Sequence, residues 1–313
     1  MGTNGKAGNL FEFALLILLG VLWGVPFALT KISLTSIPPL TLVAARVLIA
    51  AATLWMIIAL SGYKIPNPRG WIGRLFVQGI ITCAIPYALI AYGQQSVDSA
   101  LAAILNSTAP LFVCLISVIW VHQEPVTREK LFGVTVGLGG VVLIAGASAL
   151  AGLGHAMVGQ AAILLATISS AVSVILGRRL VAIPAEVAAA GTLTCAAVVL
   201  VPLSSALETP WHTAPSAASI IALLINAVFA TAVGFVIYFR LIRTIGAVST
   251  ASVGYLKPAV GVLIGCSLMG EPFSWTTAIG LAAILLGVAA IHQSESLKAS
   301  WMALKMGIRA RPV

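Results

Sequence analysis

Residues Ala100 to Gly146 read ALAAILNSTAPLFVCLISVIWVHQEPVTREKLFGVTVGLGGVVLIAG, and residues Val248 to Gln293 read VSTASVGYLKPAVGVLIGCSLMGEPFSWTTAIGLAAILLGVAAIHQ. Both follow one plan: an apolar segment with an internal proline, a Glu-Pro turn, and a second apolar segment with glycines seven residues apart. A shift of 147 residues superposes the turns and glycines, and a shift of 148 superposes the prolines. The superposed pairs are Glu124 and Glu271, Pro125 and Pro272, Gly133 and Gly280, Gly140 and Gly287, and Pro110 and Pro258. The repeated order indicates an internal duplication.

The composition is that of a membrane protein. The chain has 313 residues, of which 60% are hydrophobic and 8% are charged, whereas a soluble domain carries about 25% charged residues. Apolar runs of the roughly 20 residues that cross a bilayer recur along the whole length. We therefore expect an all-α integral membrane protein in a lipid bilayer. The net charge of +9 falls in short loops and the tail without a basic aromatic patch, so we expect no nucleic-acid partner.

The pattern predicts ten transmembrane helices, arranged as an inverted repeat of five plus five. Residues 1–150 form the first five-helix repeat, residues 151–292 form the second, and residues 293–313 form a basic cytoplasmic tail. The ten spans are expected at about 10–34, 40–61, 71–94, 98–122, 129–149, 158–180, 185–207, 215–242, 247–269 and 274–292. With both termini in the cytoplasm, 14 of the 17 lysines and arginines fall at cytoplasmic ends, as the positive-inside rule requires. An odd number of spans per repeat inverts the second half and suits alternating access.

Two prolines interrupt the duplicated helices. A proline inside a helix removes one hydrogen bond and pushes on the carbonyl four residues earlier, which is Asn106 for Pro110 and Gly254 for Pro258. Within lipid a freed carbonyl needs a partner, so we expect both breaks to face the protein interior or a wet cavity. Their polar neighbours at the same depth, Asn106 and Tyr255, become candidate substrate-binding residues.

Two cations lie inside predicted spans. Lys257 sits about ten residues from either end of its span, and a charge at that depth costs several kcal/mol unless it is hydrated or paired. It either lines a cavity, where it contacts substrate or a coupling proton, or binds freed carbonyls as a structural residue. Arg46 either lines the same cavity or reaches the external interface. Trp23 and Tyr87 lie beside prolines at mid-depth and serve either a cavity wall or packing.

The remaining polar residues limit which ligands the site could bind and which reactions it could catalyse. Asn226 either hydrogen-bonds substrate or joins helices. All eight acids lie at or near span ends, so a cationic site at mid-depth suits a ligand that bears a carboxylate. A zwitterion also fits if its ammonium meets carbonyls and aromatic faces. No paired carboxylates at mid-depth, His-rich motif or Ser/His/Asp set is present, so we expect no enzyme, cofactor or metal site.

The sequence resembles the EamA family of the drug/metabolite transporter superfamily. The resemblance rests on Leu22-Trp23-Gly24 with Lys31, on Arg46, and on the repeated Pro, Glu-Pro and Gly-rich segments. It implies an inverted ten-helix fold in the bacterial inner membrane and export of small metabolites. We expect a monomeric secondary exporter of amino acids, with a central cavity lined by spans one, three, four, six, eight and nine. A carrier of a nucleoside or organic acid is the alternative. Lys257 and Arg46 have no basic mates in the other repeat, so the site is expected to be asymmetric.

Overall fold

The computed structural model describes residues 3–62, 70–97, 99–116, 127–150, 156–257, 259–260, 275, 278–288 and 290. Within these ranges the regular structure is helical, which confirms the all-α class. Pro258, both Glu-Pro turns and the basic tail lie outside the described residues. Six segments are long and apolar enough to cross a membrane: Leu10–Ser33, Pro39–Leu60, Ile72–Gly93, Met157–Leu180, Ala185–Leu207 and Ala217–Thr244. Each of the six coincides with a predicted span.

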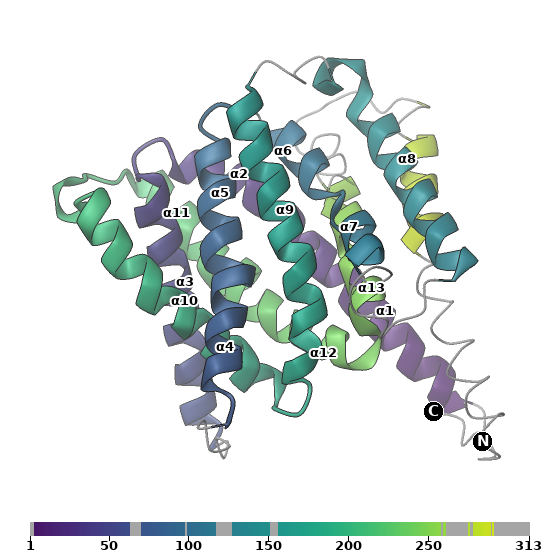
Figure 1. The fold of residues 1–313 in the computed structure, drawn as a ribbon, viewed down its shortest axis with the longest axis horizontal. Coiled ribbons are helices and arrows are strands. Elements are labelled where there is room, and N and C mark those ends of the chain that lie inside the picture. The colour runs from purple at the N-terminus through teal and green to yellow at the C-terminus, as the bar shows by residue number, and fades with distance from the viewer. Residues whose placement is uncertain are drawn as a thin grey trace.

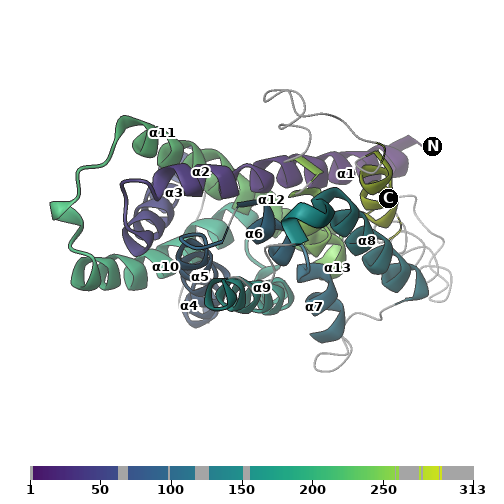
Figure 2. The same ribbon diagram turned by 90° about the horizontal axis from the view of Figure 1, so that it is seen from above.

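The helices form a bundle of three groups that lie side by side (Figures 1 and 2). One side holds α3 (Pro39–Leu60), α10 (Ala185–Leu207) and α11 (Ala217–Ile225), and the middle holds α4 (Ile72–Gly79), α5 (Ile85–Gly93) and α9 (Met157–Gly177). On the far side α8 (Arg128–Leu150) lies beside the yellow helix of residues 278–288. The first span, α1 (Thr3–Gly24) and α2 (Pro26–Ser33), crosses the bundle obliquely and reaches all three groups.

Five of the predicted spans are interrupted within the described residues. The first breaks at Val25, and the third and eighth contain π-helical turns at Ile80–Ala84 and Asn226–Val233, the latter followed by α12 (Gly234–Thr244). The fourth breaks between α6 (Ser99–Asn106) and α7 (Ala109–Ile116), and the ninth breaks after α13 (Gly246–Ala251). Helix interruptions of this kind arise at prolines and π turns. Irregular backbone therefore occurs in five of the helical segments that the structure describes.

Side chains and neighbouring helices accommodate this irregular backbone. Pro86 lacks an N–H and would push on the carbonyl of Thr82, and the π turn that contains Thr82 widens the helix there. In the other π turn the Thr231 hydroxyl donates to the Asn226 carbonyl at 2.9 Å, and the Trp23 indole N–H donates to the Ala230 carbonyl at 2.9 Å. The loosened carbonyls therefore have partners inside the protein, as lipid surroundings demand.

The breaks in spans four and nine meet. The fourth span breaks at Ser107 and Thr108, where Pro110 predicted it. The ninth breaks at Ser252, two residues before the expected Gly254. A Cβ atom on Gly254 would lie 3.4 Å from Pro110 Cδ and 3.8 Å from Ser107 Cα. The two interrupted segments thus pack directly on each other.

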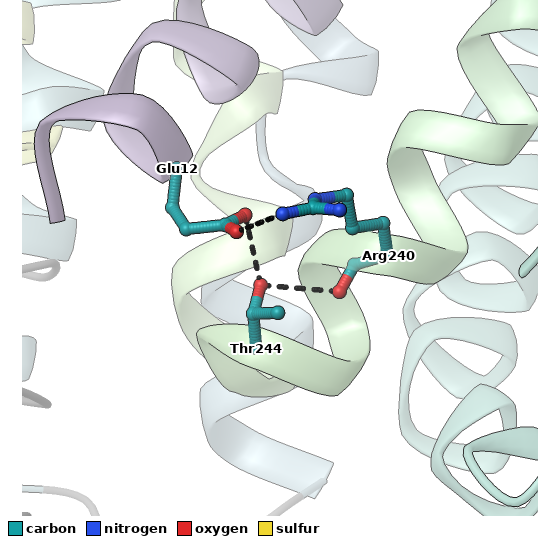
Figure 3. Close-up of polar contacts among 3 residues, drawn as sticks. All are labelled: Glu12, Arg240 and Thr244. Atoms are coloured by element: carbon teal, nitrogen blue, oxygen red, sulfur yellow. Dashed lines mark hydrogen bonds and ion pairs between the residues drawn. The ribbon is translucent and has the colours of Figure 1, made fainter. Parts of the chain in front are cut away.

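Two carboxylates at helix ends connect the first span and α3 to other helices. Glu12 of α1 accepts hydrogen bonds from Arg240 Nη2 at 2.8 Å and from the Thr244 hydroxyl at 3.0 Å, both on α12 (Figure 3). At the start of α3 the Glu208 carboxylate accepts from the backbone N–H of Leu40 at 2.9 Å and of Thr41 at 2.6 Å. A carboxylate at a helix N-terminus satisfies unpaired N–H groups and complements the helix dipole. Span one is thereby tied to span eight, and span two to span seven.

Duplicated glycines form the contact between α8 and residues 278–288. A Cβ atom on Gly140 would lie 2.6 Å from the Gly280 carbonyl oxygen, and one on Gly287 would lie 2.6 Å from the Gly133 carbonyl oxygen. The lower-numbered glycine of each helix meets the higher-numbered glycine of the other, so the two helices run antiparallel. Small residues at such contacts allow membrane helices to approach closely.

Gly287→Ala is expected to destabilise the protein. The added methyl group would meet the Gly133 carbonyl oxygen at 2.6 Å and the Gly137 amide nitrogen at 2.7 Å. Both are backbone atoms that no rotamer change can move, so we expect a loss of about 1–3 kcal/mol. Thermal unfolding in detergent measures the effect. Gly139→Ala is the matched control because no atom lies within 4 Å of its added Cβ; equal unfolding midpoints for the two variants would contradict the close helix contact.

Candidate functional site

The interruptions surround a cavity of about 120 Å³. This is room for several water molecules, since one water needs about 10–15 Å³ of such space. Its walls come from spans one, three, four, six, eight and nine, as predicted, and also from span two, which supplies Leu42, Val43 and Arg46. No aspartate or glutamate belongs to its lining in the part of the chain that the structure describes.

Arg46 of α3 faces this cavity and does not reach the external interface. Its side chain is buried, and Nε donates to the Thr231 hydroxyl at 2.7 Å. The guanidinium carbon lies 4.1 Å from the centroid of the Tyr87 ring, which is a cation–π distance. Tyr87, predicted as a cavity residue from its place beside Pro86, is therefore both a lining residue and a support for Arg46.

Lys257 enters the cavity from span nine. Its Nζ donates a hydrogen bond to Asn106 Oδ1 and lies 5.7 Å from the centroid of the Trp23 ring and 5.8 Å from that of Phe27. Arg46 lines the same cavity, so the two positive charges disfavour each other there. Two cations thus face one cavity without a carboxylate among the described lining residues.

The Asn106 amide is fixed in orientation. Its Nδ2 donates to the Thr167 hydroxyl at 3.2 Å, and that hydroxyl donates to the Ile163 carbonyl at 2.8 Å. A carbonyl oxygen only accepts hydrogen bonds, so the Thr167 proton points to Ile163 and its lone pair receives Asn106 Nδ2. This network assigns Oδ1 of Asn106 to Lys257. The chain of donors links spans nine, four and six at the cavity wall.

An aromatic cluster forms the wall between spans one and eight. The Trp23 ring lies 5.3 Å from the Tyr238 ring and 6.0 Å from the Phe235 ring, measured between centroids. Trp23, Phe235 and Tyr238 all line the cavity. Phe27, on the helix after the first break, lines it as well. The cavity therefore combines positive charge with an extended aromatic surface.

The structure brings together five of the seven predicted site residues, namely Trp23, Arg46, Tyr87, Asn106 and Lys257. Tyr255 does not line the cavity: its hydroxyl donates to the Val134 carbonyl of α8 at 3.0 Å and its side chain is fully buried. Asn226 also lies behind the cavity wall, where its Nδ2 donates to the Thr30 hydroxyl at 3.3 Å. Asn226 therefore joins helices, the alternative weighed for it from the sequence, and Tyr255 packs the bundle.

Sequence reasoning missed four neutral polar residues of the lining, namely Thr30, Thr82, Gln94 and Thr250. Gln94 Nε2 donates to the Phe27 carbonyl at 3.1 Å, and the Gln94 carbonyl accepts from Lys31 Nζ at 2.9 Å. These bonds connect the end of span three to the half of span one beyond its break. Gln94 gives no signal because it ends an apolar run, whereas Thr82 lies four residues before Pro86, a spacing that marks the freed carbonyl.

Comparisons with known proteins agree with this architecture. The model of the EamA-like transporter family matches twice, at residues 10–146 and 157–292. The chain is 27% identical to YedA of Escherichia coli, an uncharacterized inner membrane transporter, over 91% of this chain and 92% of that protein. It is 25% identical to the protein PecM of Dickeya dadantii over 84% and 86% of the two chains. A solved crystal structure that is 21% identical has the same fold, with a TM-score of 0.74 over 91% of this chain and 97% of that one. This chain belongs to the EamA-like transporter family and is a multi-pass membrane transporter, not an enzyme.

Proposed function

We propose that this protein exports amino acids, aromatic and other neutral ones, by alternating access through the central cavity. The observation that carries the proposal is the pairing of Arg46 and Lys257 on one cavity whose described lining holds no acid. A carboxylate placed between two cations relieves their repulsion and replaces their lost hydration. The cluster of Trp23, Phe27 and Tyr238 offers aromatic surface to an apolar side chain. The sequence also resembles a bacterial aromatic amino acid exporter of the same superfamily.

An organic acid is the second candidate substrate. A zwitterion must place its ammonium near two positive charges, with aromatic faces and hydroxyl groups such as Thr82 as its partners. An organic acid has no ammonium to place, so the lack of a carboxylate among the described lining residues favours it. Both substrates share the carboxylate that the cations would bind.

We further propose that the fold is an inverted repeat of ten spans, with halves at residues 1–150 and 151–292 and the tail at 293–313. The double match of the family model supports the duplication. The antiparallel contact of α8 with residues 278–288 supports the inversion, because Gly133 and Gly140 are the repeat mates of Gly280 and Gly287. Mates that exchange places in one contact are what a pseudo-two-fold axis between the halves would produce.

The proposed orientation places both termini in the cytoplasm of a bacterial cell, with the spans in the inner membrane. Arg240 lies at the end of the bundle that holds the start of α1, because it binds Glu12. Arg243 borders the turn at Gly177 and Leu180, beside Arg178 and Arg179. This concentration of arginines at one end supports a cytoplasmic assignment. We propose that the transporter acts as a monomer without cofactor or metal.

Counterflow in proteoliposomes tests the proposed substrate. Vesicles that contain the purified protein are preloaded with unlabelled phenylalanine, leucine, succinate or uridine, and uptake of labelled phenylalanine is followed with and without an imposed pH gradient. We expect accumulation with either amino acid inside and none with succinate or uridine. The same assay is run with labelled succinate outside the vesicles. If labelled succinate exchanges only with internal succinate, the organic-acid proposal replaces the amino-acid one. The gradient arm distinguishes simple facilitation from proton coupling.

A further inference from the structure

Arg46 is held in place by neutral groups. Its Nε donates to the Thr231 hydroxyl at 2.7 Å, and the Tyr87 ring covers its plane at 4.1 Å. Thr231 in turn donates its proton to the Asn226 carbonyl at 2.9 Å, so its lone pair is the atom that faces Arg46. Asn226 is anchored to Thr30. The fold therefore fixes the position and plane of the guanidinium without a carboxylate from the protein.

The outer edge of the guanidinium is left for a ligand. Neither Nη1 nor Nη2 has a hydrogen-bond acceptor among the residues that the structure describes, although Arg46 is only 9% exposed and lines the cavity. A buried charge within a membrane span is costly unless it is paired or hydrated. The two Nη groups present parallel N–H donors in one plane, and this arrangement matches the two oxygens of a carboxylate.

Lys257 differs from Arg46 in this respect. Its Nζ already donates to Asn106 Oδ1 and lies between the rings of Trp23 and Phe27. An ammonium group is also a point charge without a preferred plane. Lys257 therefore adds positive charge to the cavity, whereas the geometry needed to orient a carboxylate belongs to Arg46.

We propose that Nη1 and Nη2 of Arg46 form the carboxylate subsite of the transporter, and that Thr231 and Tyr87 are the residues that position it. The proposal rests on the proposed function insofar as the transported molecule bears a carboxylate. It assigns the substrate's orientation: the carboxylate lies against Arg46 on the side that faces Lys257, and the rest of the molecule extends toward the aromatic cluster.

Binding of benzoate and benzamide to the purified full-length chain tests the subsite, because the two probes have nearly the same shape and differ in charge. Calorimetry on the wild type is expected to show benzoate bound at least about tenfold more tightly than benzamide. Arg46→Lys keeps the positive charge and removes the planar pair of donors, so benzoate affinity is expected to fall about tenfold while benzamide affinity stays unchanged. Arg74→Lys is the matched control, since Arg74 stacks on Trp71 outside the cavity lining.

A second variant covers the case in which Arg46→Lys does not fold. Thr231→Val keeps the arginine at position 46 but removes the acceptor that positions its Nε. Benzoate affinity is therefore expected to fall severalfold, with benzamide affinity unaffected. The inference is overturned if wild-type protein binds both probes alike, or if Lys257→Met rather than the Arg46 and Thr231 variants removes the preference for benzoate. Counterflow separates the two proposals. If benzoate binds through Arg46 but phenylalanine does not exchange, only the proposed substrate is refuted. If phenylalanine exchanges but Arg46→Lys binds benzoate with unaltered affinity, only the subsite is refuted.

Discussion

Lys257→Ala is expected to abolish phenylalanine counterflow, or to reduce it sharply, at normal levels of protein in the vesicle membrane. The substitution removes one of the two positive charges of the cavity and the donor that Asn106 Oδ1 accepts. A close pair of opposite charges in a binding site couples by about 1.5 kcal/mol or more, which corresponds to a loss of at least about tenfold in affinity. The initial rate of labelled phenylalanine accumulation measures the effect.

Two further substitutions at this position separate charge from shape. Lys257→Met keeps most of the side-chain length and should be as inactive as Lys257→Ala, because charge is the property in question. Lys257→Arg keeps the charge and should retain partial activity. Wild-type rates in Lys257→Ala would refute the role of this residue in substrate binding and favour the structural reading, in which Lys257 serves only to bind Asn106.

Asn106→Asp is expected to weaken the preference of the transporter for ligands that bear a carboxylate. Asn106 Oδ1 is aimed at Lys257 by the chain through Thr167 and Ile163, so an aspartate there would place a carboxylate against the lysine. The resulting internal ion pair would compete with a substrate carboxylate and lower the net positive charge of the cavity by one. We expect the KM for phenylalanine to rise about tenfold or more, while phenethylamine, which lacks the carboxylate, should bind more tightly than it does to the wild type.

Thr167→Val is the control for this prediction. It removes the acceptor for Asn106 Nδ2 and leaves the charge of the cavity unchanged. Some loss of stability is expected, with the preference for phenylalanine over phenethylamine retained. An Asn106→Asp protein that exchanges phenylalanine with the wild-type KM would show that the Asn106 and Lys257 pair lies outside the substrate path.

The positions of the spans could be predicted because hydropathy and proline placement are local properties of the sequence. The apolar run of residues 185–207 coincides with α10, and the break before Pro110 lies where the missing N–H requires it. The duplicated glycines mark a close helix contact, in which Gly140 meets Gly280 and Gly287 meets Gly133. Which glycines meet depends on the crossing of two distant helices, and no local pattern contains that information.

The direction in which side chains point was harder to predict from the sequence. Tyr255 and Lys257 are two residues apart, and residues at that spacing do not share a helix face, so only one of them could enter the cavity. The sequence alone gave no reason to choose between them once both were placed near mid-depth. Arg46 illustrates the other limit, because its partner Thr231 is 185 residues away and lies in a π turn that contains no proline. Such a turn leaves no simple trace in the sequence.

Chemical labelling of Ser170→Cys tests most directly whether the cavity is a positively charged, water-filled substrate path. Ser170 lines the cavity from α9, and the four native cysteines would be replaced by alanine in the background. Rates of reaction with an anionic and a cationic methanethiosulfonate are compared, each relative to its rate with a small free thiol. We predict that the anionic reagent is favoured and that phenylalanine slows both reactions. Equal relative rates that phenylalanine leaves unchanged would contradict the assignment of the cavity as the transport site.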